Sequence, residues 1–239
     1  EVFTNAENRL GELDELYEIA GYPVKRRYEM FAEHEEPVLL RNAALIRYIN
    51  VMLAAGELER PLALLEDTYF HRQEGMNSLH DLYADACLLN GLAMSEKGDW
   101  VAAREFFGKA DTYPENFMTG VASRDPKRSQ IYYYIAQAEA ALDHPELAND
   151  WYQKAIQNHK KDSGFDYFVA LSYRAIGETQ AMEAITLEMA DLGNRLLNGA
   201  EGEDFFSKFG ASKGSPHRRA SRKLVLAVVD LVRSNRQAA

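Results

Sequence analysis

The stretch NGLAMSEKGDWVAAREFFGKADTYP, residues 90–114, decides the fold of this chain. Its informative residues are small, aromatic or turn-forming: Gly91, Gly98, Asp99, Ala103, Phe107, Ala110 and Pro114. Gly98 and Asp99 favour a turn between two helical segments, and Pro114 cannot continue a helix. Gly91 and Ala103 are small enough to let two helices approach closely. The stretch therefore predicts two helices that fold back on each other across a tight turn.

The same pattern recurs along the chain. After a shift of 45 residues, Ala136, Ala148, Tyr152 and Ala155 stand where the first copy has Gly91, Ala103, Phe107 and Ala110. An earlier copy keeps Gly56 at its turn, and a later one keeps Gly177. Units of roughly 34 to 45 residues with this spacing resemble tetratricopeptide repeats (TPRs), which are stacked helix pairs.

We therefore predict an all-α fold, a TPR-like α-solenoid of about four helix pairs with extra N-terminal helices and a C-terminal capping helix. The expected helix pairs are 37–55 with 58–69, 77–97 with 99–112, 127–142 with 145–159, and 165–176 with 178–197. The expected boundaries, all within a single domain, are 1–36 for the N-terminal helices, 37–197 for the repeats, 198–215 for a flexible loop and 216–239 for the capping helix.

The capping helix is expected over 217–235. Its apolar residues recur at helical spacing and need to be buried, so we place this helix on the last repeat. The residues are Leu224, Val225, Val228, Val229 and Val232.

Composition and charge exclude several classes of function. The 239 residues are 46% hydrophobic and 27% charged, as in globular proteins, and no apolar run reaches the length of a membrane span. Residues 1–204 hold 19 Lys and Arg against 36 Asp and Glu, whereas residues 205–239 hold 8 against one. An acidic body repels phosphate backbones, so we expect no nucleic acid as partner, and without an apolar run of membrane-spanning length we expect no membrane partner.

The sequence says less about the location of the protein and about its full length. No signal-peptide pattern opens the sequence, which favours a cytoplasmic location. The chain begins with Glu1 rather than Met, and we expect it to be part of a longer protein. The single cysteine, Cys87, lies in an apolar helical segment and is expected to be a buried thiol.

The sequence contains none of the common catalytic or cofactor motifs, such as a phosphate-binding loop or a His-Glu-x-x-His pair. We therefore expect no cofactor, no metal and no catalytic residues, and no enzyme activity from this chain alone. His80, Asp81 and Asp85 lie on adjacent turns of one helix, where a solvated helix face explains them better than a metal site.

Two turns interrupt the plain repeat and supply the candidate site. Both follow the second helix of a pair, at residues 69–75 and 112–120, so we expect them to emerge on the same edge of the solenoid. Their polar and aromatic side chains suit a polar peptide or a polyhydroxylated ligand. The candidate contacts are His71, Glu74, Tyr113, Glu115 and Asn116.

The order of three short motifs adds a family resemblance. The motifs are Asp14-Glu15-Leu16-Tyr17, a turn with Phe70, His71, Glu74 and Gly75, and Tyr113-Pro114-Glu115-Asn116. Over about residues 8–195 the chain resembles the carboxy-terminal TPR region of the bacterial DUF5107 family. In that family the helical region follows a β-rich domain thought to be related to carbohydrate-active proteins. The resemblance implies the helical part of a larger, carbohydrate-linked protein.

These observations leave three hypotheses of function. The first is a TPR-type scaffold that docks against another protein, or against its own missing N-terminal domain, through the edge with the two turns. The alternative is that the same edge contributes polar residues to a carbohydrate-binding site completed by that domain. The third is a solenoid groove that captures an extended peptide. No sequence feature names the partner.

Overall fold

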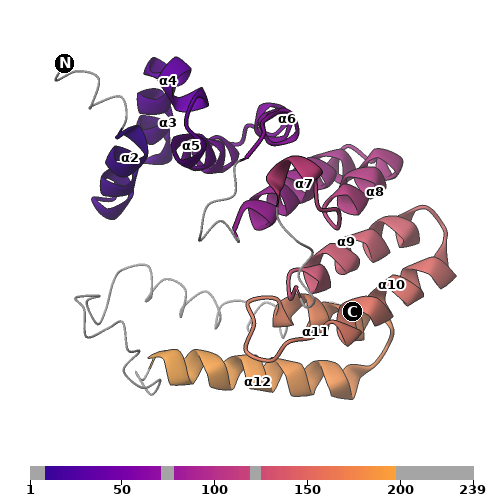
Figure 1. Ribbon diagram of the computed structural model, residues 1–239. Helices are drawn as coiled ribbons and strands as arrows, with labels where there is room; N and C mark the ends of the chain where they lie inside the picture. Colours follow the sequence, from indigo (N-terminus) through magenta and orange to yellow (C-terminus); the bar gives the residue numbers. More distant parts are fainter. Residues whose placement is uncertain (1–8, 71–77, 119–124, 198–239) are drawn as a thin grey trace, which may run out of the picture. The chain divides into compact units, whose positions relative to one another are not determined.

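The computed structural model describes residues 9–70, 78–118 and 125–197. Throughout these ranges every regular element is helical, which confirms the all-α prediction. The chain divides into two compact units, Glu1–Ser123 and Arg124–Ala239, whose helices are labelled in Figure 1. Each unit is built from consecutive helix pairs of the TPR-like kind. The expected loop at 198–215 and the expected helix at 217–235 lie outside the described residues.

In the first unit the described residues, 9–70 and 78–118, form three helix pairs and one short helix. Its elements are α2 (Leu10–Ile19), α3 (Val24–Glu33), α4 (Glu35–Leu39), α5 (Asn42–Ala54), α6 (Glu59–Asp67), α7 (Ser78–Glu96), α8 (Trp100–Lys109) and the 3-10 turn η1 (Glu115–Phe117). Helices α2 and α3, α5 and α6, and α7 and α8 pack as neighbours, and α5 also contacts α2, α3, α4 and α7.

In the second unit the described residues, 125–197, form two helix pairs. Its elements are α9 (Arg128–Ala141), α10 (Pro145–Gln157), α11 (Asp166–Ala175) and α12 (Thr179–Leu197). Helix α9 packs along α10 and α11 along α12, while α11 also contacts both α9 and α10. These two pairs agree with the predicted ones to within two residues at each end, as expected where helix ends fray.

One turn geometry joins the helices of all five pairs. In each, a residue with positive φ follows the first helix: Gly21 (75°), Gly56 (89°), Gly98 (79°), Asp143 (62°) and Gly177 (83°). The amide of this residue donates to the carbonyl three residues back, and the next amide donates to the carbonyl five residues back. This is the Schellman arrangement, which satisfies the last carbonyls of a helix. The α2–α3 pair therefore repeats the structure of the later pairs.

The turn between α7 and α8 shows why its sequence is so informative. Gly98 adopts the left-handed conformation at no steric cost, and the Asp99 carboxylate accepts a hydrogen bond from the Ala102 amide at 3.0 Å. Asp99 is thus the N-cap of α8. One glycine and one acid end the first helix and start the second.

The predicted equivalence of the two best copies is confirmed. All eight positions are buried: Gly91, Ala103, Phe107 and Ala110 in the first unit, and Ala136, Ala148, Tyr152 and Ala155 in the second. At Gly91 the approach is so close that a Cβ atom would overlap the Phe107 ring. In the second unit Ala136, Ala148 and Tyr152 form one apolar cluster.

The structure corrects one predicted helix. A single helix is expected over 37–55, but α4 ends at Leu39 and α5 begins at Asn42. Arg41 has extended backbone angles, which the helix cannot accommodate. The break lets α4 and α5 each bury an apolar side chain. Val38 of α4 and Leu45 of α5 are both buried, whereas Leu40 between them is exposed. Neither Gly nor Pro marks this position, so the sequence carries no turn signal there.

A buried charge network ties α2 to α3 and α5. The Asp14 side chain is fully buried and accepts hydrogen bonds from Arg27 Nε (2.7 Å), Arg27 Nη2 (2.9 Å) and Arg47 Nε (2.8 Å). Arg47 Nη2 also donates to Glu18 at 2.9 Å. The hydrogen bond with Asp14 raises the pKa of Arg27 above its ordinary value. A carboxylate shared by two guanidinium groups holds three helices together.

Candidate functional site

The described parts of the two candidate turns lie together in the first unit. The amide of Phe70, after α6, donates to the carbonyl of Asn116 in η1 at 2.9 Å. The expectation that the two turns share one edge is thus confirmed for these residues. His71 and Glu74 lie outside the described residues, so their predicted role stays a prediction.

Asn116 is the residue that fastens one turn to the other. Its side-chain amide donates to the carbonyls of Leu65 (2.8 Å) and Thr68 (2.7 Å), at the C-terminal end of α6. The donor lies 51 and 48 residues further along the chain than these carbonyls, so the amide acts as a distant cap for the end of the helix. The side-chain amide of Asn116 therefore serves to hold the two turns together within the fold.

Buried aromatic rings pack together where the two turns meet. Phe70 and Phe117 are both buried, and their rings meet edge to face with centroids 5.5 Å apart. Tyr83 of α7 meets Phe117 in the same way, also at 5.5 Å. Such pairs stabilise beyond the area they bury. The turn that carries Asn116 is therefore rigidly seated on α7.

Tyr113 stacks on a histidine of α7. The rings of His80 and Tyr113 are parallel, with an interplanar angle of 3° and centroids 3.7 Å apart. His80 Nε2 also lies 3.1 Å from the carbonyl oxygen of Thr112. His80 is buried, so the prediction that it belongs to a solvated helix face is wrong. The reason is tertiary: the turn after α8 folds over this residue.

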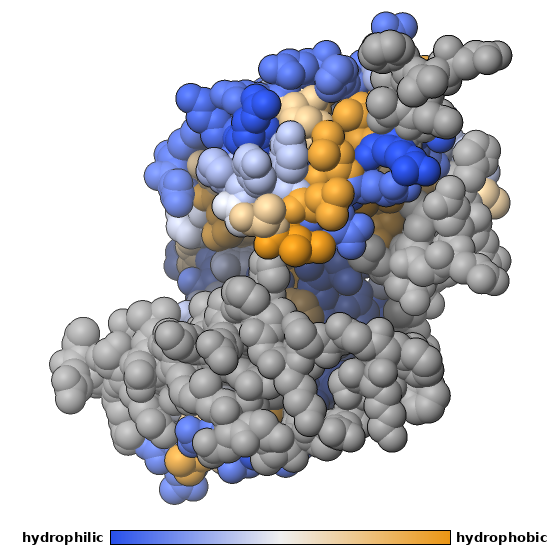
Figure 2. All heavy atoms as spheres, turned by 90° about the vertical axis from the view of Figure 1, so that its left-hand side faces the viewer, coloured by the Kyte–Doolittle hydropathy of each residue, from blue (hydrophilic) through white to orange (hydrophobic). Residues whose placement is uncertain are grey.

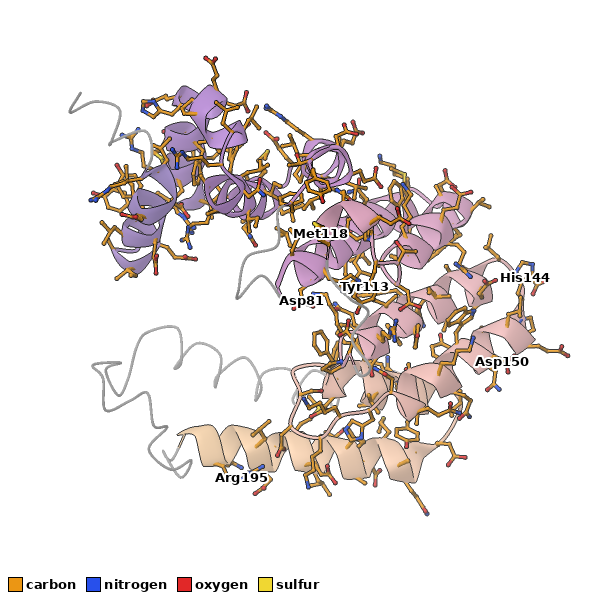
Figure 3. All side chains as sticks on the ribbon, viewed as in Figure 1. Asp81, Tyr113, Met118, His144, Asp150 and Arg195 are labelled. Carbon is orange, nitrogen blue, oxygen red and sulfur yellow. The ribbon has the colours of Figure 1, made fainter. Side chains whose placement is uncertain are left out.

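Tyr69, Glu115 and Met118 form an exposed set at this edge, and Thr112, the first residue of the second turn, is exposed as well. Tyr69 and Met118 are each about half exposed, and the Tyr69 hydroxyl donates to Met118 Sδ at 2.7 Å. Met118 has positive φ (50°), and its amide donates to the carbonyl of Glu115 at 3.1 Å. We call this set the α6–η1 edge. In Figure 3, Met118 and Tyr113 lie with Asp81 at the end of the α7–α8 pair opposite its Gly98 turn.

The chemistry of the α6–η1 edge is that of recognition. It offers a phenol, a thioether and a carboxylate on a backbone fixed by Asn116 and Phe117. A tyrosine and a methionine bury large apolar area on binding and are enriched in protein interfaces. The sequence analysis names Glu115 as a candidate contact and does not single out Tyr69 and Met118, whose exposure depends on how the two turns meet.

We predict that Asn116→Ala lowers the free energy of unfolding of the first unit by about 1 to 2 kcal/mol, because it leaves two carbonyls without their donor. The adjacent Glu115→Ala is the matched control. Its side chain is exposed, so the change should stay within about 0.5 kcal/mol. Urea unfolding of both variants measures the difference. Equal stabilities would show that the Asn116 cap contributes nothing.

Cys87 lies on α7, one helical turn after Tyr83. Burial raises the pKa of the Cys87 thiol from 9.0 to about 12, and burial also raises the pKa of Tyr83. The expectation of a buried thiol is confirmed. Because the thiolate is the reactive species, burial makes Cys87 inert at neutral pH.

We predict that iodoacetamide alkylates Cys87 in the folded protein at least about 100-fold more slowly at pH 9 than in urea. Between pH 8 and pH 10 the folded rate should keep rising about tenfold per pH unit, since a pKa raised to about 12 lies above this range. The rate in urea should level off near the ordinary pKa. Mass spectrometry of timed samples measures both rates. A folded rate that levels off near pH 9 would contradict the raised pKa.

No family model and no curated protein matches the chain. Among solved structures, the chain is similar to YrrB, described as a TPR protein with an unusual peptide-binding site. The match has 14% identity and a TM-score of 0.35, and it covers 87% of this chain and 97% of that one. The fold assignment rests on the repeated turns and helix pairs above.

The described helices also bear on membrane insertion. None of the helices in residues 9–70, 78–118 and 125–197 is both long and apolar enough to span a bilayer.

Proposed function

We propose that this chain is a TPR-type scaffold that docks against another protein, or against a further domain of its own polypeptide, through the α6–η1 edge. The observation that carries the proposal is the way this edge is built. Asn116 and Phe117 fix the backbone from within, while Tyr69, Glu115 and Met118 remain exposed. A rigid surface with exposed aromatic and thioether groups loses little conformational entropy when it binds.

Helical repeats suit this role for a general reason. Each pair contacts only its neighbours, and the connections between pairs emerge as exposed turns. In this chain the connection after α8 is held by hydrogen bonds rather than left as a simple turn. One partly buried amide and two buried aromatic rings hold this turn in place, which supports a binding role for it.

The carbohydrate alternative derives from the resemblance to the DUF5107 family. One observation favours it: an exposed tyrosine lies on the same edge as an exposed carboxylate, a combination able to contact a sugar ring and its hydroxyls. Against it, Asn116 and Tyr113 are already engaged by Leu65, Thr68 and His80. Two of the five predicted contacts thus have packing partners, and we place protein docking first.

An affinity capture with matched variants tests the proposal. The immobilised chain is compared with the edge variant Tyr69→Ala/Glu115→Lys/Met118→Ala and with the control Leu147→Ala/Leu187→Ala, whose leucines are exposed in the second unit. We expect a partner that binds the parent and the control, and binds the edge variant at least about tenfold less. A partner retained equally by all three would overturn the assignment to this edge.

A sugar screen separates the alternative. Thermal unfolding is followed with a library of mono- and oligosaccharides for the parent and for Glu115→Ala. A ligand at about 100 times its dissociation constant stabilises the folded state by about 2.7 kcal/mol. A sugar that stabilises the parent but not Glu115→Ala would place the carbohydrate function first. If the docking proposal is correct, no sugar in the library should stabilise the folded state.

A further inference from the structure

The outer face of α2 is apolar and exposed. Leu16 is 61% exposed and Ile19 is 71% exposed, while Leu13 and Tyr17 are partly buried beside them. Tyr22, after the helix, is about half exposed and stacks on Tyr17 with ring centroids 4.5 Å apart. We call these five residues the α2 stripe. Figure 2, which faces the side where α2 lies, shows a band of apolar atoms bordered by polar ones.

The packing of α2 within its own unit does not require this stripe. The opposite face of the helix supplies the contacts: Leu10 and Asp14 are buried, and Gly11 lies against the backbone of Ala44 in α5. Two neighbouring aliphatic side chains left mostly in water therefore indicate a surface that another element covers.

The border of the stripe is acidic. Glu12 and Glu15 are exposed on the outer side of α2, one helical turn before Leu16 and Ile19. Glu12 makes a long, exposed ion pair with Arg9, at 3.9 Å. Glu18, in contrast, is engaged by Arg27 and Arg47. The surface thus fits a helix with an apolar stripe and basic flanks.

The chain itself contains a segment with this chemistry. Residues 217–235, which lie outside the described residues, carry apolar side chains at helical spacing together with a basic cluster. The apolar residues include Leu224, Val225, Val228, Val229 and Val232, and the basic cluster consists of Arg218, Arg219, Arg222 and Lys223 with His217. Apolar spacing and charge sign both complement the α2 stripe.

We propose that the α2 stripe binds residues 217–235 of a second copy of this chain, with Glu12 and Glu15 facing the basic cluster. This contact is heterologous, because it joins different surfaces of the two copies. It leads either to a closed pair, when each copy supplies its segment to the other, or to a longer head-to-tail assembly. The inference is independent of the partner proposed for the α6–η1 edge.

Sedimentation of the whole chain over a concentration series tests this proposal. We expect a mass that rises above the 27.1 kDa of one copy with increasing concentration, and falls back when a synthetic peptide of residues 217–235 is added in excess. Leu16→Glu and Ile19→Glu should each weaken the association by about 10- to 100-fold, because each places a charge in a buried apolar contact. The matched control is Leu187→Glu, at a leucine of α12 that is 62% exposed, and it should associate like the parent.

A charge exchange tests the acidic border. Arg218→Glu/Arg219→Glu should weaken the association, and combining it with Glu12→Arg/Glu15→Arg should restore most of it. Circular dichroism of each variant checks that helix content is unchanged. A chain that stays at 27.1 kDa at every concentration would overturn the proposal, and would indicate that residues 217–235 are covered within their own copy. An association that Leu16→Glu leaves intact, or that Leu187→Glu weakens equally, would overturn it as well.

Discussion

Replacement of Asp14 by alanine is expected to lower the free energy of unfolding of the first unit by about 3 to 5 kcal/mol. The Asp14 carboxylate is fully buried and is bound by Arg27 and Arg47. Removing it leaves two guanidinium groups, only 13% and 29% exposed, with the 44% exposed Glu18 as their remaining carboxylate partner. Because these arginines come from α3 and α5, the loss should loosen the packing of both helices on α2.

The measurement needs a signal from the first unit alone. The chain has two tryptophans, Trp100 in α8 and Trp151 in α10. In a Trp151→Phe background, the fluorescence of Trp100 during urea unfolding reports the first unit. Glu18→Ala is the matched control, because Glu18 contacts the same two arginines but is 44% exposed. It should cost no more than about 1 kcal/mol. Equal costs for the two variants would contradict a dominant role for Asp14.

Asp14 also shows what the sequence can and cannot predict. Its position in an acidic, helical stretch predicts the helix but equally predicts an exposed side chain. Its partners lie 13 and 33 residues further along the chain, and no periodicity links them. The turns behave differently, because each is encoded within a few residues. Gly98 and Asp99 specify theirs completely, and the other turns with positive φ follow the same local rule.

The candidate site likewise has one aspect that the sequence predicts and one that it does not. Its place in the fold was predictable, because both turns follow the second helix of a pair. The role of single residues was not, since a polar side chain in a turn can serve a ligand or cap a helix. Asn116 caps α6 and Tyr113 covers His80, whereas Glu115 between them is exposed. Only the contact between distant segments distinguishes these roles.

Replacement of Gly91 by valine is expected to lower the free energy of unfolding of the first unit by about 3 kcal/mol or more, and replacement by alanine by about 1 to 3 kcal/mol. A Cβ at Gly91 would lie 2.5 Å from Phe107 Cδ1 and closer still to Cε1. Phe107 is buried, so its ring cannot move into open space. The Trp151→Phe background and urea unfolding apply here too.

The alanine variant sets steric overlap against helix propensity. Gly91 is inside α7, where alanine is intrinsically better than glycine by about 1 kcal/mol. If propensity dominated, Gly91→Ala would stabilise the unit, and the close crossing of α7 and α8 would not explain the glycine. If overlap dominates, replacing the ring by a smaller side chain with Phe107→Leu should lower the free energy of unfolding less in the Gly91→Ala background than in the parent, by about 1 kcal/mol.

The second unit supplies the matched control for this comparison. Ala136 occupies the position of Gly91 and packs in one cluster with Ala148 and Tyr152. Here the methyl group is already accommodated, so Ala136→Gly removes a packed group and lowers helix propensity together. We expect it to destabilise the second unit by about 1 to 2 kcal/mol, followed by Trp151 fluorescence in a Trp100→Phe background. Opposite substitutions at equivalent positions should therefore both destabilise, because each crossing is fitted to its own aromatic ring.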